Sequence, residues 1–441
     1  MKRKLFDKLS DWKHSSHRKP ILLTGGRGVG KTYLAYDFAK AFYSNVIYLN
    51  FEREPILIDL FQANKNISMK EILKNKISMK ETLEPVLLIL DEITAYPDLK
   101  DLSKRINEVI DTHDIILISS NIRSFPDNSY WEKYFQEEEQ FIQFQLFPLD
   151  FEEYLIASSN EWYIDAIKSH YKKNKSIPEI VHKELLTYFE DFIQIGGMPS
   201  AVNEYVNMDS TCNVSEKHRI IMDSYLSDMN RYLSNGTALK VSQVFSTIAN
   251  QLIKENHKFQ YTMIRKGATQ ALYEDALLYL QDTFYGYYCY KVGDDFFEIK
   301  LDRDSDGNYT NKCDLNACSV FKLYMPDVGL LSSSILLQNV KNTEQIRKGI
   351  IENYVAQSLI SNGHPLYFWE SSSQAKVDFI IMKNSEYVPI EVRIDDKTRS
   401  KNISVFKTKC SQMTESIKIS TKNFEYVNGV KYVPIYAAFC I

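Results

Sequence analysis

Residues 25 to 32 carry the clearest chemical signal in the chain. They read Gly-Gly-Arg-Gly-Val-Gly-Lys-Thr and fit the pattern G-x-x-x-x-G-K-[ST]. In this pattern the backbone N–H groups of a glycine-rich turn surround phosphate oxygens, Lys31 reaches the β- and γ-phosphates of ATP, and the Thr32 hydroxyl binds Mg²⁺. The residues expected to hold the nucleotide are Gly25, Gly26, Arg27, Gly28, Val29, Gly30, Lys31 and Thr32.

An acidic pair follows about 60 residues later. Residues 86–90 are five consecutive apolar residues, and Asp91 and Glu92 come directly after them. We expect Asp91 to hold the water shell of Mg²⁺ and Glu92 to orient or deprotonate the attacking water. Ser120 and Asn121 end another apolar run and could sense the γ-phosphate, although a plain turn at the end of a strand explains them equally well.

These residues need strands and a helix to position them. The apolar run before Gly25, the turn and the apolar-periodic residues 33–39 predict a strand, a loop and a helix that begins at Lys31. Residues 45–51, 86–90 and 115–118 are three further candidate strands. Continuous apolar runs are typical of strands buried on both faces of a parallel sheet, which binds ligands at the carboxyl ends of its strands.

Length and composition limit the class of protein. A chain of 441 residues has room for about three domains. Its net charge of −4 argues against a strongly basic nucleic-acid protein. Residues 1–19 carry seven Lys or Arg. We favour a solvated amphipathic helix as the interpretation of this basic segment over an arm that contacts DNA or a membrane. No apolar run approaches the length of a membrane span and the six cysteines are scattered without a zinc spacing, so we expect a cytoplasmic protein.

Several motifs together resemble one protein family. They are the glycine-rich turn, Leu-Asp-Glu at 90–92, Leu-Phe-Pro-Leu-Asp-Phe-Glu-Glu-Tyr-Leu at 146–155, Gly-Gly-Met-Pro-Ser-Ala-Val at 196–202 and residues 321–331. In this order they resemble a large family of uncharacterised prokaryotic AAA+-type ATPases. The resemblance implies an α/β fold with four parts: a P-loop AAA+-type parallel sheet domain (1–150), a helical lid (151–235), a winged helix-turn-helix (236–330) and a C-terminal domain similar to PD-(D/E)XK restriction nucleases (331–441).

The chain departs from this family at one position near the nucleotide. Family members usually carry a Gly-Arg pair shortly before the Leu-Phe-Pro-Leu segment, where this chain has Glu139 and Gln140. An arginine at such a site stabilises charge that develops in the transition state, so its loss lowers hydrolysis more than binding. Arg123 could substitute for it.

The nuclease-like part contains a candidate metal site. By resemblance, Asp378 and Glu391 gather Mg²⁺, Glu352 supports the metal, and Arg393 stands where the family's D…E-x-K pattern has lysine. Arginine is permanently charged and cannot act as a tunable base, which weakens the case for DNA cleavage. A surface ion pair on a hairpin is the alternative explanation, but it leaves Glu352 on the apolar stripe of its helix unexplained.

The winged-helix segment gives a mixed signal about its partner. Three helical patterns precede residues 287–299, which we expect to form a hairpin that turns at Gly293 and Asp294. The predicted recognition helix, 271–285, carries three acidic residues and no Lys or Arg, so it would repel phosphates. A winged helix that contacts protein is therefore favoured over one that contacts DNA. The only local basic cluster consists of Lys254, Lys258, Arg265 and Lys266.

Two functions follow from these patterns. The first is an ATP- and Mg²⁺-dependent ATPase whose nucleotide state controls a nuclease-like domain that binds double-stranded DNA. The second is a nucleotide-gated switch that binds DNA or protein and whose nuclease-like domain is inactive; Gln140 and Arg393 favour this one. Assembly into a homo-oligomer is a further expectation, since relatives often complete their sites across subunits.

Overall fold

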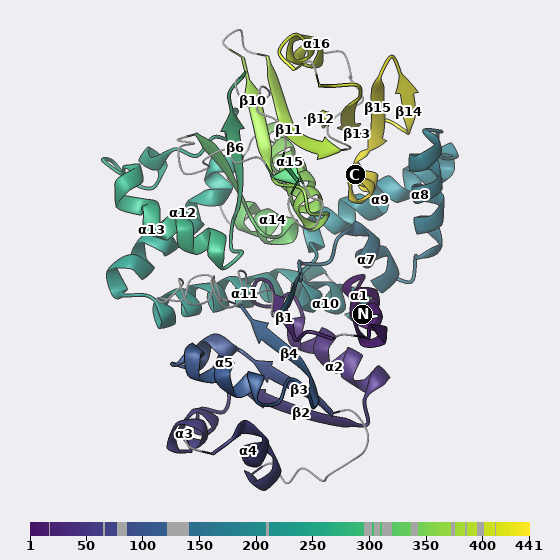
Figure 1. The fold of residues 1–441 in the computed structure, drawn as a ribbon. Coiled ribbons are helices and arrows are strands. Elements are labelled where there is room, and N and C mark those ends of the chain that lie inside the picture. The colour runs from purple at the N-terminus through teal and green to yellow at the C-terminus, as the bar shows by residue number, and fades with distance from the viewer. Residues whose placement is uncertain are drawn as a thin grey trace. The chain divides into compact units, whose positions relative to one another are not determined.

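The chain folds into two compact units in a computed structural model (Figure 1). The first comprises Met1–Phe147 and Asp282–Phe284, and the second comprises Pro148–Gln281 and Tyr285–Ile441. The structure describes residues 1–16, 18–64, 67–76, 86–120, 141–208, 211–294, 302–303, 309–310, 320–336, 343–371, 375–383, 386–394, 401–410 and 412–441. Asn121, Arg123, Glu139 and Gln140 therefore lie outside the described residues.

The first unit alternates strands and helices along the chain. Its helices are α1 (Leu5–His14), α2 (Lys31–Phe42), α3 (Ile56–Ala63), α4 (Met69–Lys76) and α5 (Leu99–Asn107). Its strands are β1 (Ile21–Thr24), β2 (Asn45–Asn50), β3 (Val86–Asp91), β4 (His113–Ser119) and β5 (Ile142–Gln145). The strands form one parallel sheet in the order β2-β3-β4-β1-β5. The predicted strand, loop and helix around residue 25 and the parallel sheet are confirmed.

The order of the strands brings the two predicted halves of the site to one edge. β4 lies between β1 and β3, so Ser120 at the end of β4 is placed between the glycine-rich turn after β1 and the acidic pair at the end of β3. Leu88 and Leu90 belong to the core that β2–β4 share with α3, α4 and α5. Alternation turns Leu87 and Ile89 to the other face of β3, where α2 packs.

The second unit begins with helices and ends with a large sheet. Its helices are α7 (Phe151–Ala157), α8 (Trp162–Lys173), α9 (Glu179–Ile195), α10 (Pro199–Met208), α11 (Thr211–Tyr232), α12 (Asn235–Leu252), α13 (Gln270–Asp282, whose last residue belongs to the first unit), α14 (Val328–Leu336), α15 (Thr343–Ser361) and α16 (Asn402–Lys407). Its strands are β6 (Tyr287–Val292), β7 (Asp302–Arg303), β8 (Tyr309–Thr310), β9 (Phe321–Tyr324), β10 (Tyr367–Glu370), β11 (Lys376–Lys383), β12 (Glu386–Val392), β13 (Ser416–Ser420), β14 (Glu425–Val427) and β15 (Val430–Pro434). Among the described residues, no helix is both long and apolar enough to cross a membrane.

The large sheet crosses the boundary that we predicted at residue 330. Its order is β14-β15-β13-β12-β11-β10-β6-β9, so β6 and β9 from the predicted winged helix join strands from the predicted C-terminal domain. The neighbours of β6 are β9, antiparallel, and β10, parallel. In the sheet, β6 therefore pairs with β9 and β10 and not with a strand of the predicted hairpin. The second arm of that hairpin, 295–299, lies outside the described residues. The pattern of apolar and polar residues within β6 could not reveal these partners, because β10 is about 75 residues away along the chain.

Parts of three of the sequence motifs meet inside the second unit. Gly196 and Gly197 follow the end of α9, where glycine commonly ends a helix. The buried Asp327 carboxylate accepts a hydrogen bond of 2.6 Å from Gly197 N, and Leu149 N donates one of 2.7 Å to Gly197 O. A Cβ at Gly197 would lie 1.9 Å from Leu149 O. The motifs at 146–155, 196–202 and 321–331 are therefore needed for packing.

Candidate functional site

The glycine-rich turn has the geometry that phosphate binding requires. Gly30 has φ 97° and immediately precedes α2, so only a residue that tolerates the left-handed region can start the helix there. Gly25 has φ 142°, and a Cβ at this position would lie 2.2 Å from Leu146 O. The turn therefore leads the chain tightly from β1 into the amino end of α2, where backbone N–H groups and the helix dipole favour an anion.

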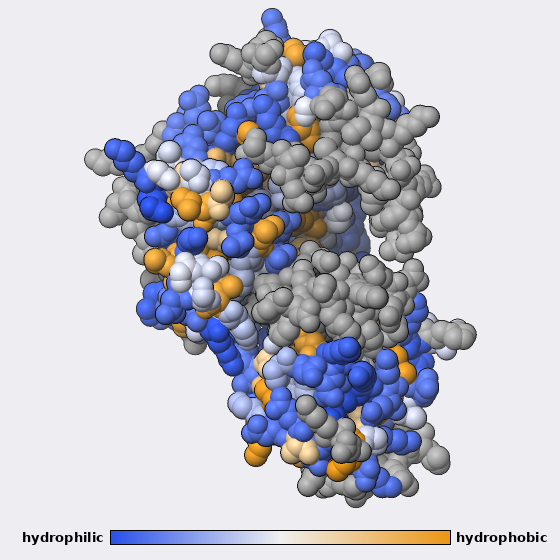
Figure 2. Space-filling view, turned by 60° about the vertical axis from the view of Figure 1, so that its left-hand side comes forward, coloured by the Kyte–Doolittle hydropathy of each residue, from blue (hydrophilic) through white to orange (hydrophobic). Residues whose placement is uncertain are grey.

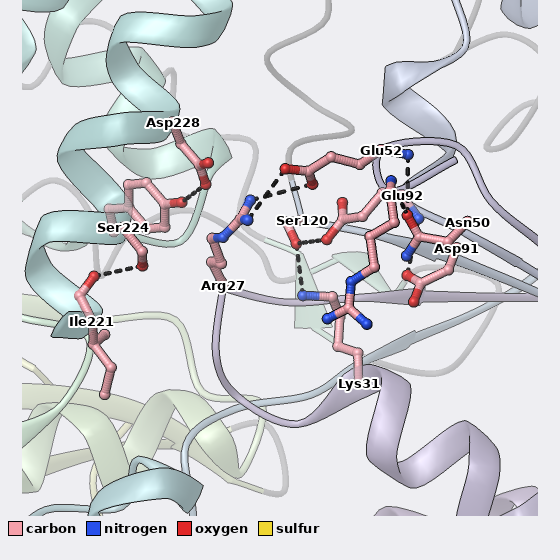
Figure 3. Close-up of polar contacts among 12 residues, drawn as sticks. Arg27, Lys31, Asn50, Glu52, Asp91, Glu92, Ser120, Ile221, Ser224 and Asp228 are labelled. Carbon is pink, nitrogen blue, oxygen red and sulfur yellow. Dashed lines mark hydrogen bonds and ion pairs between the residues drawn. The ribbon is translucent and has the colours of Figure 1, made fainter. Parts of the chain in front are cut away.

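Lys31 lies inside the turn rather than in solvent. Only 5% of its surface is exposed, and its Nζ donates hydrogen bonds to Gly25 O (2.9 Å), Gly26 O (3.0 Å) and Ser120 Oγ (2.9 Å). Figure 3 shows this ammonium group pointing toward Ser120. The three acceptors are uncharged, so phosphate oxygens would be stronger partners for the ammonium group.

Asp91 is held beside the first helical turn of α2. The Thr32 hydroxyl donates to Asp91 Oδ2 at 2.8 Å, and the Tyr48 hydroxyl donates to the same oxygen at 2.7 Å. Asn50 Nδ2 donates to the Tyr48 oxygen at 3.0 Å, which fixes the tyrosine in turn. A hydroxyl and a carboxylate oxygen thus lie side by side, and oxygen ligands of this kind are what Mg²⁺ prefers.

Glu92 follows Asp91 directly and has an unusual backbone conformation. Its φ of 49° puts a non-glycine residue in the left-handed region, a kind of strain found at functional sites. Glu92 Oε1 accepts a hydrogen bond of 2.8 Å from the Ser120 hydroxyl. Burial raises the pKa of Glu92, and nearby Asp91 raises it further, whereas Lys31 and the hydrogen bond from Ser120 oppose the rise. A carboxylate with a raised pKa is suited to take a proton from water.

Arg27 lies at the outer side of the turn. Its guanidinium group donates hydrogen bonds of 3.2 Å and 3.4 Å to the carboxylate of Glu52. Figure 3 shows the two side chains facing each other. Glu52 follows β2, and its backbone N–H bonds Asn50 Oδ1 at 3.0 Å. The pair is partly exposed, so it is available to a charged ligand at modest energetic cost.

The donor set in the first unit fits ATP and Mg²⁺. It offers an ammonium group, the amides of a helix amino end and an adjacent hydroxyl and carboxylate. The structure brings together the predicted residues from the turn and from β3. Asn121 lies outside the described residues. Tyr48 was missed by sequence reasoning, because its only signal is that it lies three residues before the end of the predicted strand 45–51.

Glu352 occupies a different environment, in the core of the second unit. Its carboxylate accepts hydrogen bonds from His257 Nδ1 (2.7 Å), Lys322 Nζ (2.6 Å) and the Tyr324 hydroxyl (2.6 Å). All four residues are at least 95% buried. Burial alone would raise the pKa of Glu352, but the charges and hydrogen bonds of His257 and Lys322 outweigh it and hold that pKa well below its usual value.

Asp378 lies in the electrostatic field of this cluster. Burial and the charge of Glu352 raise the pKa of Asp378, while Lys322 lowers it. Its Oδ2 accepts a hydrogen bond of 2.9 Å from Val392 N. The partner that the carboxylate uses is therefore the main chain of β12.

Glu391 and Arg393 belong to a second group. Ile390 is the ladder partner of Phe379, whose ring lies 5.8 Å from that of Tyr324 on the Glu352 side. Alternation turns Glu391 to the opposite face, where it is bound by Arg393, by Lys418 Nζ at 3.2 Å and by Asn402 Nδ2 at 2.9 Å.

The predicted nuclease-like residues are thus divided between two polar clusters. Glu352 and Asp378 belong to one, and Glu391 and Arg393 to the other. In the part of the chain that the structure describes, no group of three or more His, Cys, Asp or Glu residues is placed to hold a metal ion. Lys322, His257 and Lys418 were missed by sequence reasoning, since each comes from a segment remote from the acid that it contacts.

Three family models match separate parts of the chain. Residues 17–155 match a family described as an AAA domain, which contains the glycine-rich turn and the acidic pair. Residues 186–342 and 347–438 match two families described as domains of unknown function, DUF8612 and DUF4143. The AAA+-type part of the resemblance is confirmed, and the winged-helix and nuclease-like parts stay predictions. No curated protein matches the chain.

Several solved structures are similar at a low level. The ORC2 protein of Aeropyrum pernix in its ADPNP–ADP complexes is 16% identical, with 78% of this chain and 92% of that chain covered and a TM-score of 0.37. AMPPCP-bound DnaA from Aquifex aeolicus is 17% identical, with coverages of 64% and 89% and a TM-score of 0.30. C. elegans PCH-2 is 15% identical, with coverages of 63% and 65% and a TM-score of 0.24. These scores are too low to support an argument, so the case for function rests on the site residues.

Proposed function

We propose that the first unit binds ATP with Mg²⁺ and hydrolyses it slowly. The observation that carries this proposal is the hydrogen-bonded series from Lys31 through Ser120 to Glu92, beside the Thr32–Asp91 pair. It joins a phosphate-binding cation, a bridging hydroxyl and a partly buried base within one small region. These are the parts that phosphoryl transfer to water requires.

Each residue has a distinct task in this reaction. Lys31 exchanges its carbonyl partners for β- and γ-phosphate oxygens, and the amides at the start of α2 bind the same group. Thr32 and Asp91 would hold Mg²⁺, which neutralises charge on the phosphates when it is bound. Glu92 accepts the proton of the attacking water, and Ser120 keeps its carboxylate oriented. The products are ADP and inorganic phosphate.

The expected slowness has a chemical reason in the sequence. An arginine that stabilises the transition state is missing where the resemblance places one, because the chain has Gln140 there. Such a residue acts on charge that develops during transfer and therefore affects turnover more than binding. Tight binding combined with slow hydrolysis suits a switch whose bound state must persist.

Calorimetric titration with Mg²⁺–ATP tests the proposal directly. Lys31→Ala is expected to abolish binding, because it removes the only side-chain cation that we assign to the phosphates. Lys40→Ala is the matched control, since Lys40 is exposed on the same helix. Equal affinity of wild type and Lys31→Ala would overturn the proposed site, as would the absence of heat with any nucleotide.

For the second unit we favour a binding element without cleavage activity. The four predicted acid and arginine residues lie in two separate clusters, and each has protein partners. Arg393 cannot replace a lysine that acts as a base. This observation supports the nucleotide-gated switch over the nuclease.

Protein is a better partner for this element than DNA. α13 exposes Leu272, Leu278, Glu274 and Asp275. The side that carries α12 and α13 comes forward in Figure 2, where hydrophobic residues lie among hydrophilic ones. Much of the nearby basic cluster is already engaged: Lys258 pairs with Glu370 at 2.5 Å, and Arg265 Nε donates to the Tyr273 hydroxyl at 3.0 Å. An acidic and apolar helix face repels phosphates but suits a basic protein surface.

A plasmid assay separates the two functions of the second unit. Supercoiled DNA is incubated with the protein, ATP and either Mg²⁺ or Mn²⁺, beside the Asp378→Ala variant. We expect no nicking by either protein. Nicking by wild type that disappears in Asp378→Ala would establish the nuclease, and ATP-dependent retention of uncut DNA would establish DNA as the partner of the switch.

A further inference from the structure

A buried arginine outside the nucleotide motif contacts the glycine-rich turn. Arg3 precedes α1 and has only 5% of its surface exposed. Its Nη1 donates a hydrogen bond of 2.7 Å to Val29 O, and its Nη2 donates one of 2.6 Å to Phe147 O. One guanidinium group therefore joins the turn to Phe147, the last residue of the segment Met1–Phe147 of the first unit. The guanidinium group is planar and holds its N–H donors in a fixed arrangement, which suits two acceptors of this kind.

The rest of α1 fixes the position of Arg3. Phe6 and Trp12 pack against Phe38 of α2, with ring centroids 6.2 Å and 6.0 Å apart. Farther along, Lys13 contacts Asp114 of β4 at 3.0 Å. These contacts hold α1 against α2, and Arg3, which precedes α1, lies beside the turn through its hydrogen bond to Val29 O. The basic amino-terminal segment is therefore partly used for internal contacts, whereas the sequence favoured a solvated face.

The contact with Val29 sets the direction of a phosphate-binding amide. In a trans peptide the C=O of one residue and the N–H of the next point in opposite directions. Since the Val29 carbonyl points to the Arg3 guanidinium, the Gly30 N–H points away from it. Gly30 is the residue with φ 97°, and its flexible backbone would otherwise allow this peptide to rotate. A charged donor on the carbonyl also polarises the peptide and strengthens its N–H as a donor.

The contact with Phe147 holds the other wall of the turn. Leu146 N donates to Thr24 O at 2.8 Å, and Leu146 O is the atom that a Cβ at Gly25 would meet. Residues 146 and 147 therefore run directly along the start of the turn. Arg3 fastens this segment and Val29 at once, so the turn is held at both its beginning and its end.

We propose that Arg3 is a positioning residue of the nucleotide site, which orients the Val29–Gly30 peptide and fastens the turn to residues 146–147. This inference rests on the proposed ATP binding. Arg3 acts through the backbone of the turn and touches no reacting atom. It acts together with Lys31: the lysine supplies the charge, and Arg3 keeps the surrounding amides in place before the nucleotide arrives.

Amide hydrogen exchange of the nucleotide-free protein tests the orienting role. We compare wild type with two variants. Arg3→Met keeps most of the side-chain length and removes both hydrogen-bond donors. Arg3→Lys keeps the positive charge but lacks the two guanidinium N–H groups that bind Val29 and Phe147. Exchange in a peptide that covers residues 28–32 is expected to be at least about tenfold faster in Arg3→Met, and Arg3→Lys should restore it only in part. Lys2→Ala is the control, because Lys2 is the exposed neighbour.

Titration with Mg²⁺–ATP gives the second measurement. The dissociation constant is expected to rise about tenfold in Arg3→Met and to stay unchanged in Lys2→Ala, with all variants folded at the temperature used. Unchanged exchange and unchanged affinity in Arg3→Met, even with a lowered unfolding midpoint, would show a purely structural arginine and overturn the inference. If wild type bound no nucleotide, the proposed function would fail, while the exchange measurement would still decide the role of Arg3.

Discussion

Ser120 and Glu92 are joined by a hydrogen bond of 2.8 Å from the serine hydroxyl to Glu92 Oε1. The same serine oxygen accepts a hydrogen bond from Lys31, so the carboxylate is tied to the ammonium group through one bridging hydroxyl. This arrangement holds Glu92 close to the cation without a direct ion pair. A direct pair would hold the carboxylate on the lysine and keep it from water.

The first prediction concerns Glu92→Gln. The amide keeps the size of the side chain and can still accept from Ser120, but it cannot take a proton. We expect Mg²⁺–ATP binding to be retained and phosphate release to fall by roughly two to four orders of magnitude, the range typical of general bases. Titration and a single-turnover assay measure the two effects. Glu54→Gln, at an exposed position close to the site, should change neither. Full turnover in Glu92→Gln would place the base elsewhere.

The nucleotide half of the site could be predicted from sequence because its chemistry is local. The turn needs Gly25 and Gly30 for backbone reasons, and Lys31 follows at a fixed spacing. Asp91 is remote along the chain, but a buried parallel strand must end at the same edge of the sheet. Arg3 could not be found in this way, because its two partners are backbone carbonyls, which leave no trace in the residue types.

The C-terminal half could not be predicted to the same degree. Glu391 and Arg393 stand two residues apart and contact each other, but this spacing could not tell which face of the sheet Asp378 shares. The β10–β11 ladder shifts register between Tyr367 and Trp369, next to Asp378, and such a shift changes the direction of side chains without any mark in the sequence.

The second prediction concerns Lys322 and Glu352. Lys322→Met leaves a buried carboxylate without its ammonium partner, so we expect the free energy of unfolding to fall by about 3–5 kcal/mol. Removing the charge from both partners in Lys322→Met/Glu352→Gln should recover part of this loss. Urea unfolding at neutral pH measures both variants, with the exposed Lys266→Met as the control.

A metal-binding role for Glu352 would give a different result. Mg²⁺ or Mn²⁺ would then raise the unfolding midpoint of wild type and leave that of Glu352→Gln unchanged. The hydrogen bonds from His257, Lys322 and Tyr324 lead us to expect no such shift in either protein.

The third prediction compares two glycines of the second unit. Gly197→Ala places a Cβ 1.9 Å from Leu149 O, where backbone must move, so we expect a loss of about 1–3 kcal/mol or more. Gly236 lies at the start of α12 with nothing within 4 Å of its Cβ position. Gly236→Ala should therefore be neutral or stabilise the protein by up to about 1 kcal/mol. Similar unfolding midpoints for the two variants would show that the Leu149–Gly197 approach does not limit packing.

The fourth prediction is a pH dependence that originates at Asp114. This carboxylate receives hydrogen bonds from Arg18 (2.7 Å), Tyr43 (2.7 Å) and Lys13 (3.0 Å), and it anchors the segment around α1 to β4. Burial alone would raise the pKa of Asp114, but these three hydrogen bonds outweigh it and lower the pKa below its usual 3.8. A lowered pKa in the folded state means that the carboxylate contributes stability above pH 3.8, and this contribution is lost as the pH falls through the folded pKa.

Asp114→Asn should therefore destabilise the protein in a pH-dependent way. We expect a loss of about 1 kcal/mol at pH 7, since Arg18 is partly exposed and solvent weakens its contribution. The difference between variant and wild type should narrow as the pH falls below 3.8, where the wild-type carboxylate is protonated first in the unfolded state and then, as the pH passes the lowered folded pKa, in the folded state. Urea unfolding across this range measures it, and Asp111→Asn, at an exposed position nearby, should show no such trend. A constant difference from pH 7 to pH 3 would mean that the contacts of Asp114 do not depend on its charge.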